Sequence, residues 1–290
     1  MLDFLDIYLL EAVINGVLLG GVLALLALGL NLIFGVIDVV WICYAELIMC
    51  GMYTVFYLHS VYHWPFLLAA IVAIAGVGAL GVILHLVVIE PLLNAEPINQ
   101  LLATGGVLAF LQSAATVMFG IDFRNVGIRL PVLALGEMHF SYSRLLAFIA
   151  AGVGMIAVYF FMTRTYTGTA IRAIAQDRQI MALMGVDTRR MYLVTSALGG
   201  GLAGLAACLL VLQYDVHPFV GLSFGPITFL ICVLGGLGNF IGGFIAAFVF
   251  AEIISLGGLF SDLEWGYVLA FAFFIAMMFV RPAGLLARRS

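Results

Sequence analysis

Two carboxylates stand inside long apolar stretches of this 290-residue chain, and they are the first candidates for chemistry. Glu46 lies within WICYAELIMC, and Glu252 follows the apolar run GGFIAAFVFA. An ionisable side chain inside a membrane span costs about 2.5–3.5 kcal/mol on insertion scales, so each one is a functional hypothesis. Each carboxyl can line a transport pathway or bind an ion. The structural alternative is a hydrogen bond to a neighbouring helix, and both interpretations stay open here.

Other reactive groups are few. All 11 basic residues are Arg, so the chain has neither a P-loop lysine nor a Schiff-base lysine. His59 and His63 have i, i+4 spacing, but no acidic or Cys ligand accompanies them. The four cysteines lie in apolar stretches without a C-x-x-C pair: Cys43, Cys50, Cys208 and Cys232. We therefore predict no enzyme activity, no cofactor and no metal, and we expect any ATP hydrolysis to occur on a separate subunit.

The composition predicts which kind of secondary structure holds these residues. The chain is 65% hydrophobic and 9% charged, with a mean hydropathy of +1.24. Soluble domains are about 45–50% apolar and about 25% charged. This excludes a soluble enzyme and a disordered chain, and it predicts an all-α, polytopic helical membrane protein. The net charge of −4, without a basic run, argues against a nucleic-acid partner.

Charge-free windows locate the membrane spans, because a helix needs about 20 residues to cross the hydrocarbon core. We predict nine crossings, with eight as the alternative, in a single transmembrane domain over 1–290. The crossings are 9–36, 39–58, 65–89, 99–120, 143–163, 191–213, 225–238, 240–258 and 264–281. The seventh is short and can be a broken or re-entrant helix.

Arginine sets the predicted orientation. Five of the 11 arginines fall within 164–190, and three more lie at or after the end of the last span. The positive-inside rule places both segments in the cytoplasm. With nine crossings, the N-terminus is then outside, the C-terminus is cytoplasmic, and the loop 121–142 is extracytoplasmic. The alternating stretch IRLPVLAL in that loop can form a short strand.

The cytoplasmic loop 164–190 contains a predicted helix over 168–184, with Gly185 at its C-cap. Helical spacing places Ile171, Ile174, Ala175, Met181 and Ala182 on one face. A short amphipathic helix outside the membrane is suited to a groove on a partner protein. The alternative is an ordinary basic connecting loop.

The segment GTAIRAIAQDRQIMALMGVDTRRMYLVTSALGGGLAGLAACLL (168–210) resembles the cytoplasmic loop and following helix of bacterial ABC importer permeases of the branched-chain amino-acid family. The resemblance extends over nearly the whole chain. It includes NGVLLGGVLALLALGLNLIFGVI, PLLNAEPINQLLATGGVLAFLQSAATVMFG, LGGLGNFIGGFIAAFVFAEI and the ending FVRPAGLLA. The length suits the shorter of that family's two permease types.

The resemblance implies a multi-subunit importer in the bacterial inner membrane, working by ATP-driven alternating access. Its expected partners are a second, longer permease, two ATP-binding subunits and a periplasmic substrate-binding protein. The cargo is expected to be a small polar solute: a branched-chain or other amino acid, an amide, urea or an aromatic acid. The pattern assigns ATPase coupling to one set of residues: Gly168, Ala170, Arg172, Ala173, Asp177, Ala182 and Gly185.

One segment departs from the family pattern. The family has N-[FV]-A-H-G-E after the first span, where this chain has WICYAE, so Trp41, Tyr44 and Ala45 replace Asn, His and Gly. We expect the aromatic side chains to suit a flatter or aromatic solute. The pathway candidates are polar or aromatic residues in or near spans: Trp41, Tyr44, Glu46, Asn31, Glu252 and Asn239. The alternative function is an ion-coupled secondary transporter or channel that uses Glu46 or Glu252.

Overall fold

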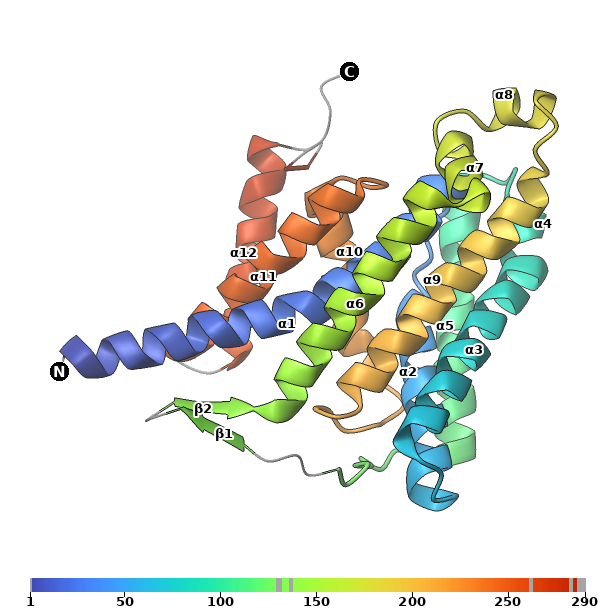
Figure 1. Cartoon of the computed structure of the whole chain (residues 1–290). Coiled ribbons are helices and arrows are strands. Elements are labelled where there is room, and N and C mark those ends of the chain that lie inside the picture. The colour runs from blue at the N-terminus through green and yellow to red at the C-terminus, as the bar shows by residue number, and fades with distance from the viewer. Residues whose placement is uncertain (1, 129–131, 136–137, 261–262, 282–283, 286–290) are drawn as a thin grey trace.

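The computed structural model describes residues 2–128, 132–135, 138–260, 263–281 and 284–285. It is a bundle of long helices with one two-stranded antiparallel hairpin at its edge (Figure 1). The elements, in chain order, are α1 (Leu2–Ile37), α2 (Tyr44–Phe56), η1 (Tyr57–Val61), α3 (Phe66–Leu84), η2 (His85–Ile89), α4 (Glu90–Leu92), α5 (Pro97–Phe119), β1 (Val132–Leu135), β2 (Met138–Ser141), α6 (Tyr142–Arg164), α7 (Tyr166–Ile174), α8 (Arg178–Leu183), α9 (Thr188–Leu210), α10 (Val220–Gly235), α11 (Phe240–Phe260) and α12 (Leu263–Val280). The segments η1 and η2 are π-helical.

The helices confirm a polytopic helical membrane protein. Each predicted span overlaps a helix, and six helical segments among the described residues are long and apolar enough to cross a membrane. The helix α10, which covers the seventh predicted span, has only 16 residues and contains Pro226. The number of crossings and the side of the membrane on which each end lies stay predictions.

The bundle has two distinct ends, which we name by what lies there. At the α7 end, α7 and α8 lie on the same side as the last described residues, beside the end of α1 (Figure 1). At the hairpin end lie β1, β2, η1 and the chain between α9 and α10 (Figure 1). The helix α1 runs between these ends and contacts α6, α9, α10 and α11, so it forms the centre of the core.

The predicted strand is confirmed. Within IRLPVLAL, β1 pairs with β2 in register Val132↔Ser141; residues 129–131 of that stretch lie outside the described residues.

The predicted single helix over 168–184 is wrong, because the chain forms two helices with a break at Ala175–Asp177. Asp177 has extended backbone, and its Oδ1 accepts hydrogen bonds from the N–H groups of Gln179 and Ile180 at 2.9 and 3.0 Å. This side chain therefore caps a new helix instead of continuing the old one.

The predicted C-cap at Gly185 is confirmed. Gly185 has φ +83°, its N–H donates to the Ala182 carbonyl, and the Val186 N–H donates to the Met181 carbonyl, both at 3.1 Å. This is the hydrogen-bond pattern of a Schellman motif, which favours glycine at the left-handed position.

Close backbone contacts hold the helices together. A Cβ on Gly200 of α9 would lie 2.7 Å from the Val77 carbonyl oxygen of α3, and one on Gly204 would lie 2.9 Å from the Ile74 Cα. In lipid, small residues at such contacts replace the hydrophobic driving force between helices. The glycine-rich segment 199–207 is therefore a packing surface for α3.

We predict that Gly200→Ala destabilises the protein, while Gly201→Ala does not. The added methyl at 200 meets backbone, whereas at 201 the nearest atom is the Ile74 Cγ2 at 3.9 Å. Overpacking of this kind costs about 1–3 kcal/mol. The difference in stability is measured by heating each variant in detergent and finding the temperature at which half of the monodisperse protein is lost. Equal midpoints for the two variants would contradict the packing described here.

Candidate translocation pathway and coupling surface

A cavity of about 270 Å³ lies between α2, α5 and α10. Its walls are mostly apolar and include Trp41, Leu108 and Phe229. Two glycines of α10 allow the close approach to α2 that forms the wall. A Cβ on Gly225 would lie 2.7 Å from the Ala45 Cβ, and one on Gly221 would lie 2.5 Å from the Glu46 Oε1.

Glu46 lies behind this glycine wall and is fully buried. Its Oε1 accepts a hydrogen bond from the Gln112 Nε2 of α5 at 2.9 Å. Its Oε2 is buried without a hydrogen-bond partner among the described residues. The carboxyl is thus half satisfied, and a buried acceptor left unpaired costs about 1–3 kcal/mol.

The helix α5 lines the cavity, and few contacts attach it to α2 and to the link between α1 and α2. Besides the Gln112 contact, the Thr104 Oγ1 lies 3.1 Å from the Val40 carbonyl oxygen, within hydrogen-bond distance. Thr104 and Gln112 are two helical turns apart on α5, which is about 12 Å. Leu108, which lines the cavity, lies midway between them. These two polar contacts therefore bracket the cavity along α5.

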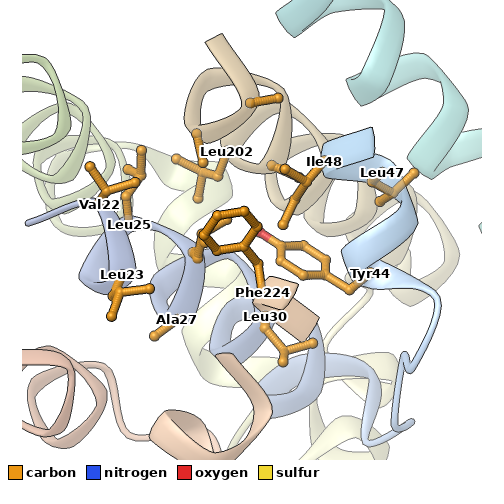
Figure 2. Close-up of a cluster of buried hydrophobic side chains, with 14 of the residues drawn as sticks. Val22, Leu23, Leu25, Ala27, Leu30, Tyr44, Leu47, Ile48, Leu202 and Phe224 are labelled. Atoms are coloured by element: carbon orange, nitrogen blue, oxygen red, sulfur yellow. The ribbon is translucent and has the colours of Figure 1, made fainter. Parts of the chain in front are cut away.

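Trp41 and Tyr44 both line this cavity but differ in where their polar atoms lie. The indole Nε1 of Trp41 is buried without a hydrogen-bond partner among the described residues. The Tyr44 hydroxyl donates to the Gly199 carbonyl at 3.4 Å, and a Cβ on Gly29 would collide with it. Figure 2 shows the Tyr44 ring extending into the core toward Phe224 and Leu30. Only the ring of Tyr44, and not its hydroxyl, is placed to face a solute.

The remaining pathway candidates lie elsewhere. The Asn31 Oδ1 accepts from the Gly238 N–H at 3.2 Å, and the Asn239 Oδ1 accepts from the Gly242 N–H at 3.0 Å, so both asparagines hold the turn between α10 and α11. Glu252 packs against Gly16, where a Cβ would lie 2.6 Å from its Oε2, at the contact between α1 and α11. The structure therefore groups Trp41, Tyr44 and Glu46 and separates the other three.

A second cavity, of about 580 Å³, opens at the α7 end between α1, α6, α7 and the α10–α11 turn. Asp38, Arg172 and Arg178 contribute its charged lining. Gly168 places α7 there, because a Cβ on it would lie 2.5 Å from the Met162 Cα of α6. The Thr165 Oγ1 caps α7 by accepting from the Gly168 N–H at 3.0 Å.

Part of the apolar face predicted for the loop 164–190 packs inside this chain and is therefore not available to a partner. Ile171 and Ile174 are buried within the chain. The break before α8 instead exposes Ile180, Leu183 and Met184, with 57%, 87% and 75% of their surface accessible. We call these three residues the α8 tip. Sequence reasoning missed the tip because a continuous helix places these residues away from the predicted apolar face.

The other residues assigned to coupling are divided between α7 and α8. Ala170 is buried in α7, Ala173 is partly buried, and Ala182 is exposed on α8. Asp177 and Gly185 form the two caps of α8.

A third cavity, of about 490 Å³, lies at the hairpin end between α10, α12 and residues 214–217. The Asp215 Oδ1 accepts from the Asn125 Nδ2 at 2.8 Å. The His217 ring lies 4.6 Å from the Phe123 ring, and burial lowers the pKa of His217 against the opposing effect of Asp215. Sequence reasoning did not single out this cavity; the pair Asp215 and His217, directly after a span, is the signal that could have found it.

The first and third cavities share a wall. Leu222 and Pro226 of α10 line both of them. Pro226 lies inside the helix, where it lacks the N–H that would bond to residue 222. The N-terminal half of α10 is thus a thin, weakened partition between a cavity at the hairpin end and the cavity beside Glu46.

A helical bundle of this hydropathy, with six helical segments among the described residues that are long and apolar enough to cross a membrane, is a multi-pass membrane protein. The sequence model described as "Branched-chain amino acid transport system / permease component" matches residues 12–278, and the chain belongs to this family. The resemblance noted from the sequence is confirmed.

Individual relatives align over nearly their full lengths. The "high-affinity branched-chain amino acid transport system permease protein" LivH of Escherichia coli K12 is 28% identical, with 97% of this chain and 96% of LivH covered. The corresponding BraD of Pseudomonas aeruginosa is 30% identical, with 96% of each covered. A solved structure, PsaBC from Streptococcus pneumoniae in complex with Fab, aligns with a TM-score of 0.47 at 16% identity, covering 97% of this chain and 92% of that one.

We predict that Asp177→Ala unfolds α8 locally, whereas Asp177→Asn does not. Alanine removes the acceptor of both capping hydrogen bonds, which costs about 1 kcal/mol, and asparagine keeps an acceptor oxygen. Hydrogen exchange of the amides in 178–186 should be about fivefold faster in the alanine variant. Unchanged exchange would show that Asp177 does not hold the break between α7 and α8.

Proposed function

We propose that this chain is a transmembrane permease subunit of a bacterial ABC importer in the inner membrane. The α8 tip is the observation that carries this proposal. It places large apolar side chains on a basic segment that the positive-inside rule assigns to the cytoplasm, where none of the residues that the structure describes covers them. Exposed apolar groups of this kind mark a protein contact. The chain lacks the lysine of a P-loop, so a partner that supplies ATP hydrolysis fits this contact.

Two further partners have room at other surfaces of the bundle: one at the side where the cavity between α2, α5 and α10 opens, and one at the hairpin end. Ile42, Leu222 and Phe229 line the cavity between α2, α5 and α10 and are also partly exposed. A second permease subunit covering this side would enclose the pathway between the two chains. A substrate-binding protein would deliver cargo at the hairpin end, beside the cavity of Asp215 and His217.

The proposed mechanism is alternating access. ATP-driven closure of two ATP-binding subunits would move the α8 tip and α7 as a unit. Since α7 packs on α6 and contacts α1, its movement would reach the end of α1 and the link to α2. That link carries Trp41, and it is attached to α5 at Val40. Movement at the α7 end would therefore change the cavity beside Glu46.

The named relatives are components of branched-chain amino acid transport systems, and we propose that the cargo of this chain is a branched-chain or related amino acid. An apolar cavity with a few polar atoms suits such a solute.

The ion-coupled alternative rests on the two intramembrane carboxyls. The Oε2 atoms of Glu46 and Glu252 are both without hydrogen-bond partners among the described residues. Such a transporter would work in liposomes as this chain alone, with an ion gradient and no ATP. The importer proposed here would be inactive under those conditions.

We predict that Leu183→Glu releases the ATP-binding subunits during purification, while Ile121→Glu does not. Leu183 is in the α8 tip, and Ile121 follows α5 toward the hairpin end with 66% of its surface exposed. Loss of a buried leucine removes about 1.5–3 kcal/mol, and a buried charge adds to that cost, so affinity should fall at least about tenfold. Native mass spectrometry of the tagged complex counts the subunits retained. Full retention by the Leu183→Glu variant would contradict docking at this tip.

A further inference from the structure

The cavity of about 580 Å³ at the α7 end is large enough for a ligand, since small-molecule sites span about 300–1,000 Å³. Its lining has a charged part and an apolar part. The charged part comes from the residue after α1, from α7 and from the start of α8. The apolar part comes from α1, α6 and the α10–α11 turn, and it includes Phe34, Met162 and Leu237. A ligand that fits both parts is itself amphipathic.

Two guanidinium groups without partners form most of the charged part. Arg172 in the last turn of α7 and Arg178 at the start of α8 both line the cavity. Neither forms an ion pair with the residues that the structure describes, whereas Arg189 and Arg190 are each paired with a carboxylate. A guanidinium group matches the oxygens of phosphate and carboxylate groups in pairs. The cavity therefore presents unused donors to an oxyanion.

The charge balance of the lining selects among oxyanions. Asp38, directly after α1, lines the same cavity and is exposed. Two arginines against one aspartate give the lining a net charge of +1. A phosphodiester carries one negative charge and balances this lining, whereas a phosphomonoester carries about −1.5 to −2 at pH 7. The extra negative charge of a phosphomonoester would be repelled by the Asp38 carboxylate.

The apolar part continues onto the exposed surface of α11. Leu237 lines the cavity and is 41% exposed. Beyond it, exposed apolar side chains follow along α11 at Ile241, Phe244 and Ile245. Their spacing of three and four residues places them on one face of the helix, and α11 is long and apolar enough to cross a membrane. An apolar chain attached to the phosphodiester can therefore lie along α11 within the bilayer.

We propose that this cavity binds the phosphodiester head group of an anionic bilayer lipid, with an acyl chain along α11. The guanidinium groups of Arg172 and Arg178 donate to the phosphate oxygens, and the Asp38 carboxylate accepts from a hydroxyl of the head group. Basic pockets between helices at the cytoplasmic side suit such head groups, and the positive-inside rule assigns the α7 end to that side. The inference goes beyond the proposed function, because it holds equally for an ion-coupled transporter.

The bound head group links two parts of the molecule that the cavity separates. The helix α7 packs on α6 and contacts α1, α8 and α9, and it faces the α10–α11 turn across the cavity. That turn is held to α1 by the Asn31 Oδ1, which accepts from the Gly238 N–H at 3.2 Å. A head group that contacts both sides of the cavity therefore couples movement of α7 to the turn that ends α10.

The test uses the whole complex in nanodiscs made of equal parts of phosphatidylglycerol and phosphatidylcholine with the same acyl chains. Native mass spectrometry of the complex released from the nanodiscs counts the lipids and the subunits that stay bound. A parallel measurement adds glycerophosphoglycerol, which is the anionic head group without acyl chains, to the complex in phosphatidylcholine alone. This second measurement distinguishes a bilayer lipid from a free phosphodiester.

Three variants change the charge of the cavity, and one control does not. Arg172→Gln and Arg178→Gln each remove one positive charge, and Asp38→Asn removes the negative charge. Asparagine is among the residues that tolerate the φ of +60° at position 38. The matched control is Arg190→Gln, on the same basic segment, because this arginine pairs with Asp187 and does not line the cavity.

We expect the unmodified complex to retain phosphatidylglycerol in preference to phosphatidylcholine. Each arginine variant should lower this preference about fivefold, and the double variant should lower it further. Asp38→Asn should raise the preference, which a purely structural role of Asp38 would not do. Arg190→Gln should retain lipids as the unmodified complex does, and glycerophosphoglycerol should bind more weakly than the intact lipid.

Three outcomes overturn the site. The first is equal retention of the two lipids, and the second is an unchanged preference in both arginine variants. The third is binding of glycerophosphoglycerol as tight as that of the lipid, which would assign the cavity to a free phosphodiester. If Arg178→Gln instead releases the ATP-binding subunits and leaves the lipid count unchanged, the guanidinium groups bind a partner protein. Failure of the proposed function is seen separately, as an unmodified sample without any ATP-binding subunit.

Discussion

The contact between the Tyr44 hydroxyl and two glycines is the constraint on which the pathway region depends. The hydroxyl lies against Gly29 of α1 and donates to the Gly199 carbonyl of α9. A Cβ on Gly29 would collide with this hydroxyl, and a Cβ on Gly199 would collide with the Ile33 side chain of α1. Because lipid offers no hydrophobic drive for helix association, such close contacts replace it. They fix the start of α2 relative to the two central helices, and with it Trp41 and Glu46.

Close glycine contacts also set the geometry at the α7 end and around the cavity beside Glu46. At the α7 end, Gly168 lets α7 fold closely onto α6, and Asp177 then turns the chain so that the α8 tip projects outward. At the centre, Gly221 and Gly225 bring α10 against α2, while α5 is attached to the α1–α2 segment by Thr104 and Gln112. Tight glycine contacts on one side of the cavity and sparse polar contacts on the other make α5 the wall most easily moved.

Much of this fold is predictable from the sequence, because a bilayer sets the length of apolar segments. The spans, the strand at Val132–Leu135 and the C-cap at Gly185 all follow from local patterns. The break at Asp177 does not, because a side chain that competes with the helix leaves no trace in apolar periodicity. The position of the Tyr44 hydroxyl depends on Gly199, which is 155 residues away, so spacing cannot predict it. The grouping of Glu46 with Gln112, and the separation of Glu252 from both, likewise depend on which helices meet.

The most direct test of the account is ATP-driven uptake by the purified complex in proteoliposomes. The complex is oriented with its hairpin end toward the outside of the vesicle. Radiolabelled leucine and the substrate-binding protein are added outside, and ATP is enclosed inside. We predict leucine accumulation that requires enclosed ATP, the binding protein and both permease subunits, and that persists when ion gradients are collapsed. Accumulation by this chain alone, driven by an ion gradient without ATP, would contradict it.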